Sequence, residues 1–305
     1  MDALAPLIAS SINAGTPLML AALGLLINEK SGVINLGSEG MMLVAAITGF
    51  AVAINTNSVA IGFMAGAAAG MVMGGFFAWL TVWLGANQVA TGLALSLFGV
   101  GASAYIGIDY VGATLTSPRF AIPFLQDLPF FGRALFRQHP MVYVSLILCA
   151  GIAGFLNRTR AGLILRSVGE SPSSAHALGY NVRRIRLAAL LFGGACCGLA
   201  GAFMSLVYTP MWVEGMVAGR GWIALALTTF ATWRPLRVLL GAYLFGGITI
   251  LTYHMQALGV PVASQLLSML PYLATILVLV LISRNASWIR LNMPASLGKN
   301  FNPNT

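Results

Sequence analysis

The chain has 305 residues, of which 58% are hydrophobic and only 8% charged, and its formal net charge is +9. A soluble domain carries about 25% charged residues, so this composition excludes a soluble protein and predicts a polytopic membrane protein. The positive charge does not indicate nucleic-acid binding, because the arginines lie between apolar segments and the chain lacks a basic face interleaved with aromatic residues.

Apolar segments long enough to cross a bilayer recur from one end of the chain to the other. A spanning helix needs about 20 such residues. The ninth segment, 222–233, is too short for a comfortable crossing and predicts a broken or re-entrant helix buried in protein, although it must cross if Arg234 and Arg237 are to lie on the cytoplasmic side. We therefore expect an all-α fold, a polytopic transmembrane helix bundle forming one domain over residues 1–305. The eight longer candidate spans are 4–27, 39–55, 59–84, 87–107, 139–157, 187–208, 238–257 and 261–283.

Arginines concentrate between residues 158 and 186. Basic residues near the ends of spans mark the cytoplasmic side of a membrane protein. With this segment inside, nine crossings place the N-terminus outside, the C-terminus in the cytoplasm and the loop 108–138 on the extracytoplasmic side. That loop holds three arginines, but Asp109 and Asp127 accompany them. The six arginines of the cytoplasmic segment are Arg158, Arg160, Arg166, Arg183, Arg184 and Arg186.

A short helix is predicted inside this cytoplasmic segment. Ser171 has the character of an N-cap, Pro172 of a first helical residue and Gly179 of a C-terminal stop. The helix has two interpretations, which the residues alone leave open. It is either a docking element for a soluble partner or a surface helix that rests on anionic lipid.

Glycines recur at four-residue spacing on one ridge of the third span, at Gly62, Gly66, Gly70 and Gly74. Small residues at this spacing let helices approach closely in lipid, so we expect this ridge to pack against a neighbouring helix. The three cysteines lie in apolar runs and are expected to be buried hydrophobes, because no Cys-x-x-Cys pair is present.

Six polar residues at membrane depth form a candidate path for a polar solute, because such groups turn toward the bundle interior or a water-filled route. Each has a structural alternative. Asn35 and Glu39 could cap the second span, and the stripe on the fourth span could serve helix packing. The candidate residues are Asn13, Asn35, Glu39, Gln88, Ser96 and Ser103.

No enzyme motif is found. The chain has no Gly-x-x-x-x-Gly-Lys-Ser/Thr phosphate loop, no His-Glu-x-x-His and no Gly-x-Ser-x-Gly. We expect no catalytic residue, no cofactor and no metal site, and ATP hydrolysis would belong to another subunit. A self-contained secondary transporter or channel is the alternative, but such proteins usually carry buried charges and inverted repeats, which this sequence hardly shows.

Several motifs, in this order along the chain, resemble the permeases of ABC importers, most closely the branch for nucleosides and simple sugars. Where Ser96 stands, that branch usually has Asn, whose amide can contact a base or ribose edge more fully than a hydroxyl. The motifs are Asn35-Leu-Gly-Ser-Glu-Gly40, Asn87-Gln-Val-Ala-Thr-Gly-Leu-Ala-Leu95, Leu165-Arg-Ser-Val-Gly-Glu-Ser-Pro172, Ala177-Leu-Gly-Tyr-Asn-Val-Arg183, Gly219-Arg-Gly-Trp-Ile-Ala-Leu-Ala-Leu227 and Trp233-Arg-Pro235.

The resemblance implies an inner-membrane subunit of a bacterial importer that works by alternating access. Its partners would be an ABC ATP-binding subunit, a second homologous permease subunit and an extracytoplasmic substrate-binding protein. It also implies that the short cytoplasmic helix sits in a groove of the ATPase and couples to it. Because Ala175 is small and lies in the middle of this helix, we expect it to face the groove, and we expect Arg183, Arg184 and Arg186 to be topology anchors near lipid headgroups. The residues assigned to coupling are Gly169, Glu170, Ser171, Pro172, Ala175, His176, Leu178 and Gly179.

Overall fold

The computed structural model describes residues 4–116, 135–258 and 292–302 and single positions between 266 and 280. Within these residues, seven helices are long and apolar enough to span a membrane. The expected all-α transmembrane bundle is thus confirmed, while the predicted span 261–283 lies largely outside the described residues. The seven helices are α1 (Leu4–Lys30), α2 (Ser38–Thr56), α3 (Val59–Ala78), α4 (Gln88–Gly107), α6 (Pro140–Arg158), α9 (Val182–Phe203) and α11 (Pro235–Ala257).

Short helical segments complete the described fold. Single π-helical turns, Trp79–Trp83 and Met204–Tyr208, extend α3 and α9, and a 3-10 turn, Ile108–Tyr110, follows α4. The other short helices are α7 (Arg160–Glu170), α8 (Pro172–Ala177) and α10 (Arg220–Phe230). The sequence predicted α8 and a short helix over 222–233, but it did not predict α7, and it placed the start of α9 five residues too late.

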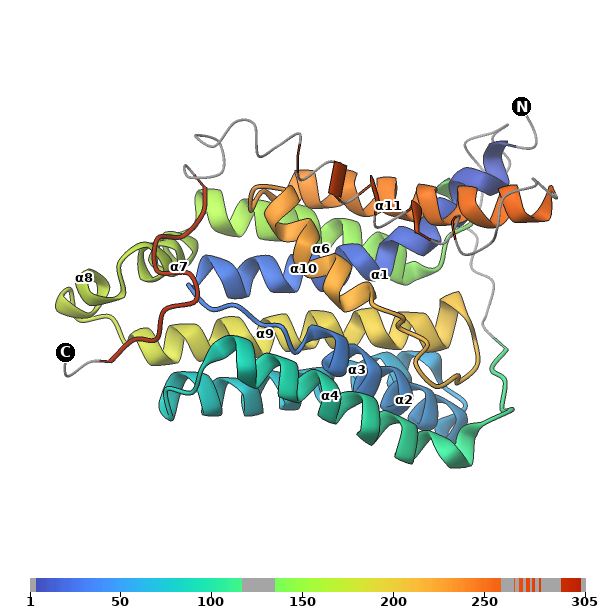
Figure 1. Cartoon of the computed structure of the whole chain (residues 1–305), viewed down its shortest axis with the longest axis horizontal. Coiled ribbons are helices and arrows are strands. Elements are labelled where there is room, and N and C mark those ends of the chain that lie inside the picture. Colours follow the sequence, from blue (N-terminus) through green and yellow to red (C-terminus); the bar gives the residue numbers. More distant parts are fainter. Residues whose placement is uncertain are drawn as a thin grey trace.

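The long helices lie side by side, and the two ends of the bundle differ (Figure 1). One end carries α7, α8, the end of α1 and the described C-terminal residues, and we call it the α7–α8 end. α1 begins at the opposite end, where α4 and α11 finish. Residues 209–219 lead from the end of α9 back toward the middle of the bundle, where α10 begins.

The glycine ridge of α3 packs against α9 and α2, as its spacing predicted. A Cβ atom at Gly66 would lie 2.7 Å from Cβ of Ala202, and one at Gly74 would lie 2.6 Å from the Leu190 carbonyl oxygen. At Gly70 the nearest atom would be the carbonyl oxygen of Gly194. The helices therefore touch backbone to backbone, which only glycine permits at this distance.

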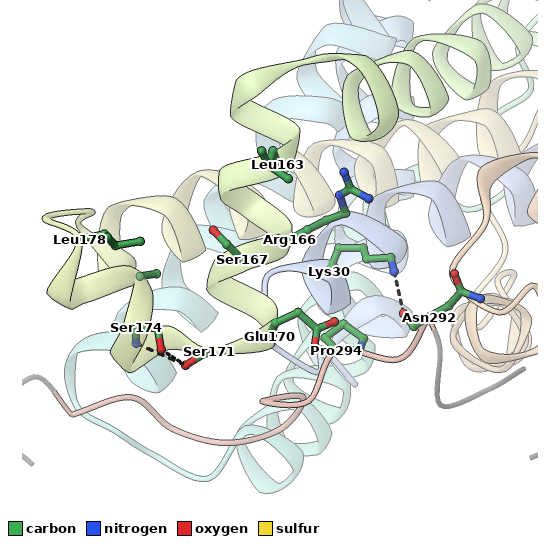
Figure 2. A pocket seen from close by; sticks show the side chains of 11 residues that line it. Lys30, Leu163, Arg166, Ser167, Glu170, Ser171, Ser174, Leu178, Asn292 and Pro294 are labelled. Carbon is green, nitrogen blue, oxygen red and sulfur yellow. Dashed lines mark hydrogen bonds between the residues drawn. The ribbon is translucent and has the colours of Figure 1, made fainter. Parts of the chain in front are cut away.

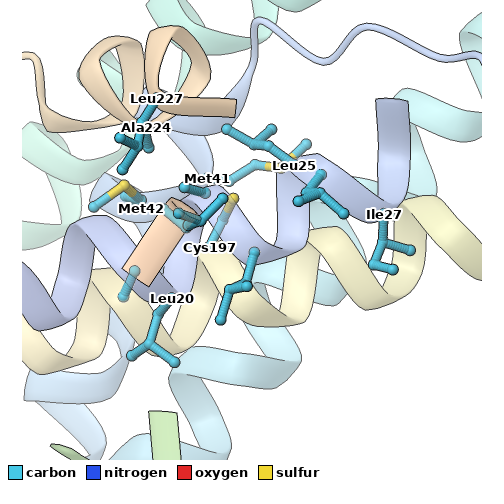
Figure 3. Close-up of a cluster of buried hydrophobic side chains, with 14 of the residues drawn as sticks. Leu20, Leu25, Ile27, Met41, Met42, Cys197, Ala224 and Leu227 are labelled. Atoms are coloured by element: carbon cyan, nitrogen blue, oxygen red, sulfur yellow. The ribbon is translucent and has the colours of Figure 1, made fainter. Parts of the chain in front are cut away.

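The main core is built around α1, which is buried along most of its length (Figure 3). Leu20 and Leu25 of α1 meet Met41 of α2, Cys197 of α9 and Leu227 of α10 in one apolar cluster. Cys149, Cys196 and Cys197 are free and buried, in agreement with the sequence. Because α1 contacts α6, α7, α9, α10 and α11, it is the element around which the described bundle is organised.

Two helices, α2 and α10, begin inside the bundle and run in opposite directions (Figure 1). At its far end α2 reaches the opposite end of the bundle, where Asn55 donates a hydrogen bond to Tyr110. The far end of α10 reaches the α7–α8 end, where Trp233 contacts Glu29 in the last turn of α1. A non-helical segment precedes each of them, 31–37 before α2 and 209–219 before α10. Each of these two helices, the 19-residue α2 and the 11-residue α10, thus continues a non-helical segment that enters the bundle.

Candidate functional site

Residues 31–37 form a non-helical segment held inside the bundle by side chains of α4. Oε1 of Gln88 accepts a hydrogen bond from the backbone N–H of Ile34 at 2.9 Å, and Oγ of Ser96 donates one to the Leu36 carbonyl at 2.9 Å. Backbone polar groups at membrane depth must find a partner inside the protein. The polar stripe on α4 therefore satisfies the backbone of this segment.

Asn35 shapes the same segment from within. Its Oδ1 accepts a hydrogen bond from the Gly37 N–H at 2.9 Å, and the residue is fully buried. The small residues between the polar ones let the chain approach. A Cβ at Gly92 would meet the backbone of Leu36, and one at Gly99 would meet Gly40. The segment consequently packs against a face of α4 on which polar side chains alternate with glycines.

Glu39 joins the beginnings of α2 and α10. Its Oε1 accepts a hydrogen bond from the Gly219 N–H at 2.8 Å, and its Oε2 accepts one from the Gly221 N–H at 2.7 Å. Ser38 adds a bond from its Oγ to the Gly221 carbonyl at 3.1 Å. The first N–H groups of a helix have no partner within it and carry partial positive charge. The Glu39 carboxylate, which is carried in the first turn of α2, thus satisfies two N–H groups at the start of α10.

The structure brings together four of the six candidate path residues. Asn35, Glu39, Gln88 and Ser96 all contact the segment 31–40 or the start of α10. Ser103 bonds only within its own helix, to the Val100 carbonyl. Oδ1 of Asn13 is buried and has no hydrogen-bond partner among the described residues, so neither side chain joins this group.

Helices α7 and α8 project from the ends of the long helices. Thr159 caps α7 by accepting from the Gly162 N–H at 3.0 Å, and Ser171 caps α8 by accepting from the Ser174 N–H at 3.3 Å. The chain turns back after α8 at Gly179, whose φ of +88° favours glycine. The caps and the stop read from Ser171, Pro172 and Gly179 are therefore where the sequence placed them.

Ala175 points into the protein, which corrects its expected position in a partner's groove. It is 2% exposed and packs in an apolar cluster with Val168 of α7 and Val182 of α9. The outward face of α8 is formed by its neighbours, and Leu178 is 76% exposed. One face of the six-residue helix α8 packs against its own chain, and Ala175 lies on that face.

Residues 292–302, which we call the C-terminal strap, cross the α7–α8 end. Ser296 donates from its N–H and its Oγ to the Gly169 carbonyl, at 3.0 and 2.6 Å. Asn300 bonds the turn between α3 and α4, and Phe301 lies against the ring of His176 at 5.6 Å between centroids. The strap therefore connects segments that are far apart in the sequence. Its further bonds are Gly298 N–H to Gly32 O, Ala295 N–H to Glu170 Oε2, Lys30 Nζ to Asn292 O and Gln88 Nε2 to Asn300 Oδ1.

Arg186 is a structural cross-link, which corrects its assignment as a headgroup anchor. The side chain is 2% exposed, and its guanidinium donates to the Ser31 carbonyl at 3.2 Å and to the Lys299 carbonyl at 3.1 Å. It lies in the first turns of α9 and not in a loop. Replacing it removes bonds to both the segment 31–37 and the C-terminal strap.

A pocket of about 460 Å³ opens at the α7–α8 end between these helices, the end of α1 and the strap (Figure 2). Figure 2 shows Lys30 reaching Asn292, with Glu170 beside Pro294 and Leu178 at the far side. The walls mix charged, hydroxyl and apolar groups from the predicted coupling residues. The residues in the pocket wall are Lys30, Leu163, Arg166, Ser167, Glu170, Ser171, Ser174, Ala175, Leu178, Asn292 and Pro294.

Two parts of the site were not foreseen from the sequence. The start of α10 at Gly219 and Gly221 appeared only as part of a motif, although Gly219 stands directly before α10 as Gly37 stands directly before α2. Glu29 accepts hydrogen bonds from Thr228 at 2.9 Å and from Trp233, and so fixes the far end of α10. The only sequence feature that pointed to Glu29 was its position as an acidic residue at the end of an apolar run.

Comparisons with known proteins agree with this architecture. A family model described as the permease component of branched-chain amino acid transport systems matches residues 7–282. A putative glucose ABC transporter permease of Haloferax volcanii is 39% identical, with 99% of both chains covered. A nucleoside ABC transporter permease of Lactococcus lactis is 30% identical over 90% of this chain and 91% of that protein. A guanosine ABC transporter permease of Bacillus subtilis is 30% identical over 86% and 87%.

No solved structure matches the chain. The family model covers nearly all of the described bundle, including the segment 31–37, α7, α8 and α10. The relatives are transport permeases, which favours an importer subunit over a self-contained secondary transporter or channel. The chain is a multi-pass membrane protein and belongs to the ABC transporter permease family of the branched-chain amino acid type.

Proposed function

We propose that this chain is the membrane-spanning subunit of an ATP-driven importer for a nucleoside or a simple sugar. The family match carries the proposal, together with relatives named for glucose, nucleosides and guanosine. Glucose and nucleosides share a hydroxyl-rich sugar, so one class of polar path suits both. The chain itself would catalyse no reaction, and the solute would cross by alternating access driven from a separate ATP-binding subunit.

The proposed assembly contains two permease subunits, this chain and a second homologous one, with ATP-binding subunits at the α7–α8 end and a substrate-binding protein at the opposite end. Support for the ATPase contact comes from α8. It is a capped helix on the outer surface, and Leu178 is largely exposed although it is apolar. Leu163, which lies in the wall of the same pocket as Leu178, is also apolar and exposed, and exposed apolar side chains that lie together are typical of protein contacts.

Leu178→Glu is expected to abolish transport while leaving the permease in the membrane. A charge at an apolar contact is unpaired when the partner covers it, which costs several kcal/mol. The measurement is ATPase activity of the reconstituted complex with and without loaded binding protein. We expect stimulation to fall to the unstimulated level in Leu178→Glu and to persist in the matched control Leu178→Met, which keeps an apolar side chain of similar volume.

Ala175→Glu would not give the same information. Because Ala175 packs against Val168 and Val182, the charge would be buried within this chain and would disturb α7, α8 and α9 together. Full stimulation in Leu178→Glu would show that α8 is not the contact that transmits ATPase motion.

We also propose that the solute path follows the segment 31–37 and its contacts with α4. In this proposal Ser96 and Gln88 position the segment, and Asn35 and Glu39 determine where α2 and α10 begin. Asn13 and Ser103 would lie farther along the same route, toward the opposite end. The support is the concentration of buried polar atoms at this place in an otherwise apolar bundle.

Ser96→Leu is expected to reduce uptake to background, because the larger side chain would push against Leu36 and Gly40 and displace the segment. Ser96→Ala removes only the hydroxyl bond to Leu36, and we expect it to retain most uptake. Measured uptake of radiolabelled nucleoside and glucose in cells with equal permease levels separates the two. Parental uptake by Ser96→Leu would exclude this path.

The proposed location is a bacterial inner membrane, with the N-terminus outside and the α7–α8 end in the cytoplasm. The support is the arginine-rich stretch at that end, since Lys and Arg near span ends favour the cytoplasmic side. The proposed coupling end and the described C-terminus would then face the ATPase together.

Labelling of intact cells tests this orientation. In a variant without the three native cysteines, Thr56→Cys lies exposed at the opposite end and His176→Cys lies exposed on α8. An impermeant thiol reagent is expected to label Thr56→Cys in intact cells and His176→Cys only after lysis. The reverse pattern would invert the topology, and the ATPase could then not meet α8.

A further inference from the structure

A second pocket at the α7–α8 end is strongly basic. It has a volume of about 540 Å³ and lies between the end of α6, α7 and the start of α11. Its wall holds four cations and, among the described residues, no carboxylate. The side chains in its wall are Lys30, Ala153, Leu156, Asn157, Arg166, Trp233, Arg234, Pro235, Leu236, Arg237 and Asn292.

The four cations converge from separate elements. Arg166 comes from α7, Lys30 from the end of α1, and Arg234 and Arg237 from the start of α11. Arg166 and Arg234 both lie close enough to Lys30 to repel its ammonium group. Like charges gathered in a concave site create a local positive potential that attracts an anion.

The neighbouring carboxylates do not occupy this pocket. Glu170 lies in the wall of the other pocket and accepts from the Ala295 N–H. Glu29 accepts hydrogen bonds from Thr228 and Trp233 and is not in the wall of this pocket. Both attract Lys30, but neither belongs to the wall that presents Arg166, Arg234 and Arg237.

The hydrogen-bond donors of the arginines in this pocket also favour an anionic ligand. Nε of Arg166 is buried and has no partner among the described residues. Arg234 is exposed and caps no helix with its side chain. Planar guanidinium groups bind phosphate oxygens in pairs, which makes arginine the usual residue for phosphate recognition.

An apolar track leads away from the pocket along α11. Leu236 is in the pocket wall and 64% exposed, and Leu240 and Leu244 follow at four-residue spacing with 68% and 46% exposure. Residues four apart share one face of a helix. The basic pocket thus stands at the end of the spans, where headgroups lie, and the leucine track runs down toward the acyl chains.

We propose that this basic pocket binds a phosphate-bearing anion, namely the phosphodiester headgroup of an anionic phospholipid whose acyl chain lies along the leucine track. Arg166 and Arg234 hold the phosphate from opposite walls, with Lys30 and Arg237 beside it. Basic pockets between spans on the cytoplasmic side are suited to such headgroups. The bound lipid would contact α6, α7 and α11 together, next to α8, the proposed coupling helix.

Native mass spectrometry of the purified complex, titrated with phosphatidylglycerol or phosphatidylcholine, tests the proposal. Each cation near an anionic headgroup strengthens binding about 5-fold, so Arg166→Gln/Arg234→Gln is expected to bind phosphatidylglycerol about 30-fold more weakly. The matched control Arg158→Gln/Arg160→Gln removes two exposed arginines at the same end, outside the pocket wall, and should bind like the parent. Phosphatidylcholine should not be retained.

Each remaining outcome bears on the proposal. Millimolar inorganic phosphate that displaces phosphatidylglycerol and binds with the same sensitivity to the variants would support the phosphate site but make the free anion its ligand. Equal retention of phosphatidylglycerol by parent, variant and control would overturn the site. Loss of the ATPase from the pocket variant with lipid retention unchanged would also overturn it, because the pocket would then be a protein contact. If the double variant has a lower melting temperature than the control, the single variant Arg234→Gln replaces it in the lipid-binding measurement.

Discussion

Glu39→Leu is expected to abolish uptake and to lower the thermal stability of the assembled complex more than any other single side-chain change on α2. The substitution leaves the N–H groups of Gly219 and Gly221 buried without acceptors. Each unsatisfied buried donor costs about 1–3 kcal/mol. The start of α10 would lose its fixed position, and the non-helical segments that precede α2 and α10 would no longer be held against each other.

Two companions make this result specific. Glu39→Gln keeps one acceptor oxygen and should fall between the parent and Glu39→Leu in melting temperature. Glu214→Leu removes an exposed carboxylate from the segment before α10 and should melt with the parent. Melting of the purified complex and uptake in cells are the measurements. A parental melting temperature for Glu39→Leu would show that the junction of α2 and α10 does not depend on this carboxylate.

Gly70→Leu is expected to prevent accumulation of the folded permease. A side chain at this position would meet the Gly194 carbonyl and the backbone of Gly198, which cannot move aside as a flexible side chain can. Overpacking a close contact costs about 1–3 kcal/mol even where side chains can adjust. Here α3 and α9 would have to separate along their whole interface, so the expected effect is larger.

Gly101→Leu is the matched control for this prediction. It introduces the same side chain into a membrane-spanning helix, but a Cβ atom at Gly101 meets nothing within 4 Å. We expect parental amounts of Gly101→Leu and almost no Gly70→Leu after extraction and size-exclusion chromatography. Comparable yields for the two variants would mean that α3 and α9 do not pack through this ridge.

The long helices could be predicted from sequence because each is a continuous apolar run. Glycine spacing also located the interface on α3, since a four-residue repeat defines one helix face without reference to the rest of the fold. Likewise, the ends of α8 could be read from Ser171, Pro172 and Gly179, because helix caps depend on local chemistry. These features require no knowledge of distant contacts.

The features that could not be predicted are side-chain contacts with residues that lie far away in the sequence. Glu39 suggested a cap for its own helix, whereas its acceptor oxygens serve Gly219 and Gly221, about 180 residues later. Arg186 suggested a headgroup anchor by its neighbours in the sequence, yet its bonds go to Ser31 and Lys299. Ala175 is small, which fits either a partner's groove or an interior face. Only the positions of Val168 and Val182 decide between them.

The sequence also showed no internal repeat, although α2 and α10 both follow non-helical segments and run in opposite directions. Their shared feature is the placement of backbone N–H groups in the bundle interior. Few side chains are needed to produce it, since glycine serves at both starts. A similarity of backbone arrangement can therefore persist with little trace in residue identity.

The C-terminal strap has a consequence for the order in which the protein matures. A chain is made from its N-terminus, and segments begin to fold as they emerge. The carbonyl groups of Gly32, Gly85 and Gly169 receive their hydrogen bonds from residues 292–302, which are synthesised after all seven described membrane-spanning helices. Phe301 then completes the surface beside His176. A chain that stops before residue 292 can insert its first spans, but it lacks these bonds and the ring of Phe301, so the surface beside α8 is completed only after residues 292–302 have been made.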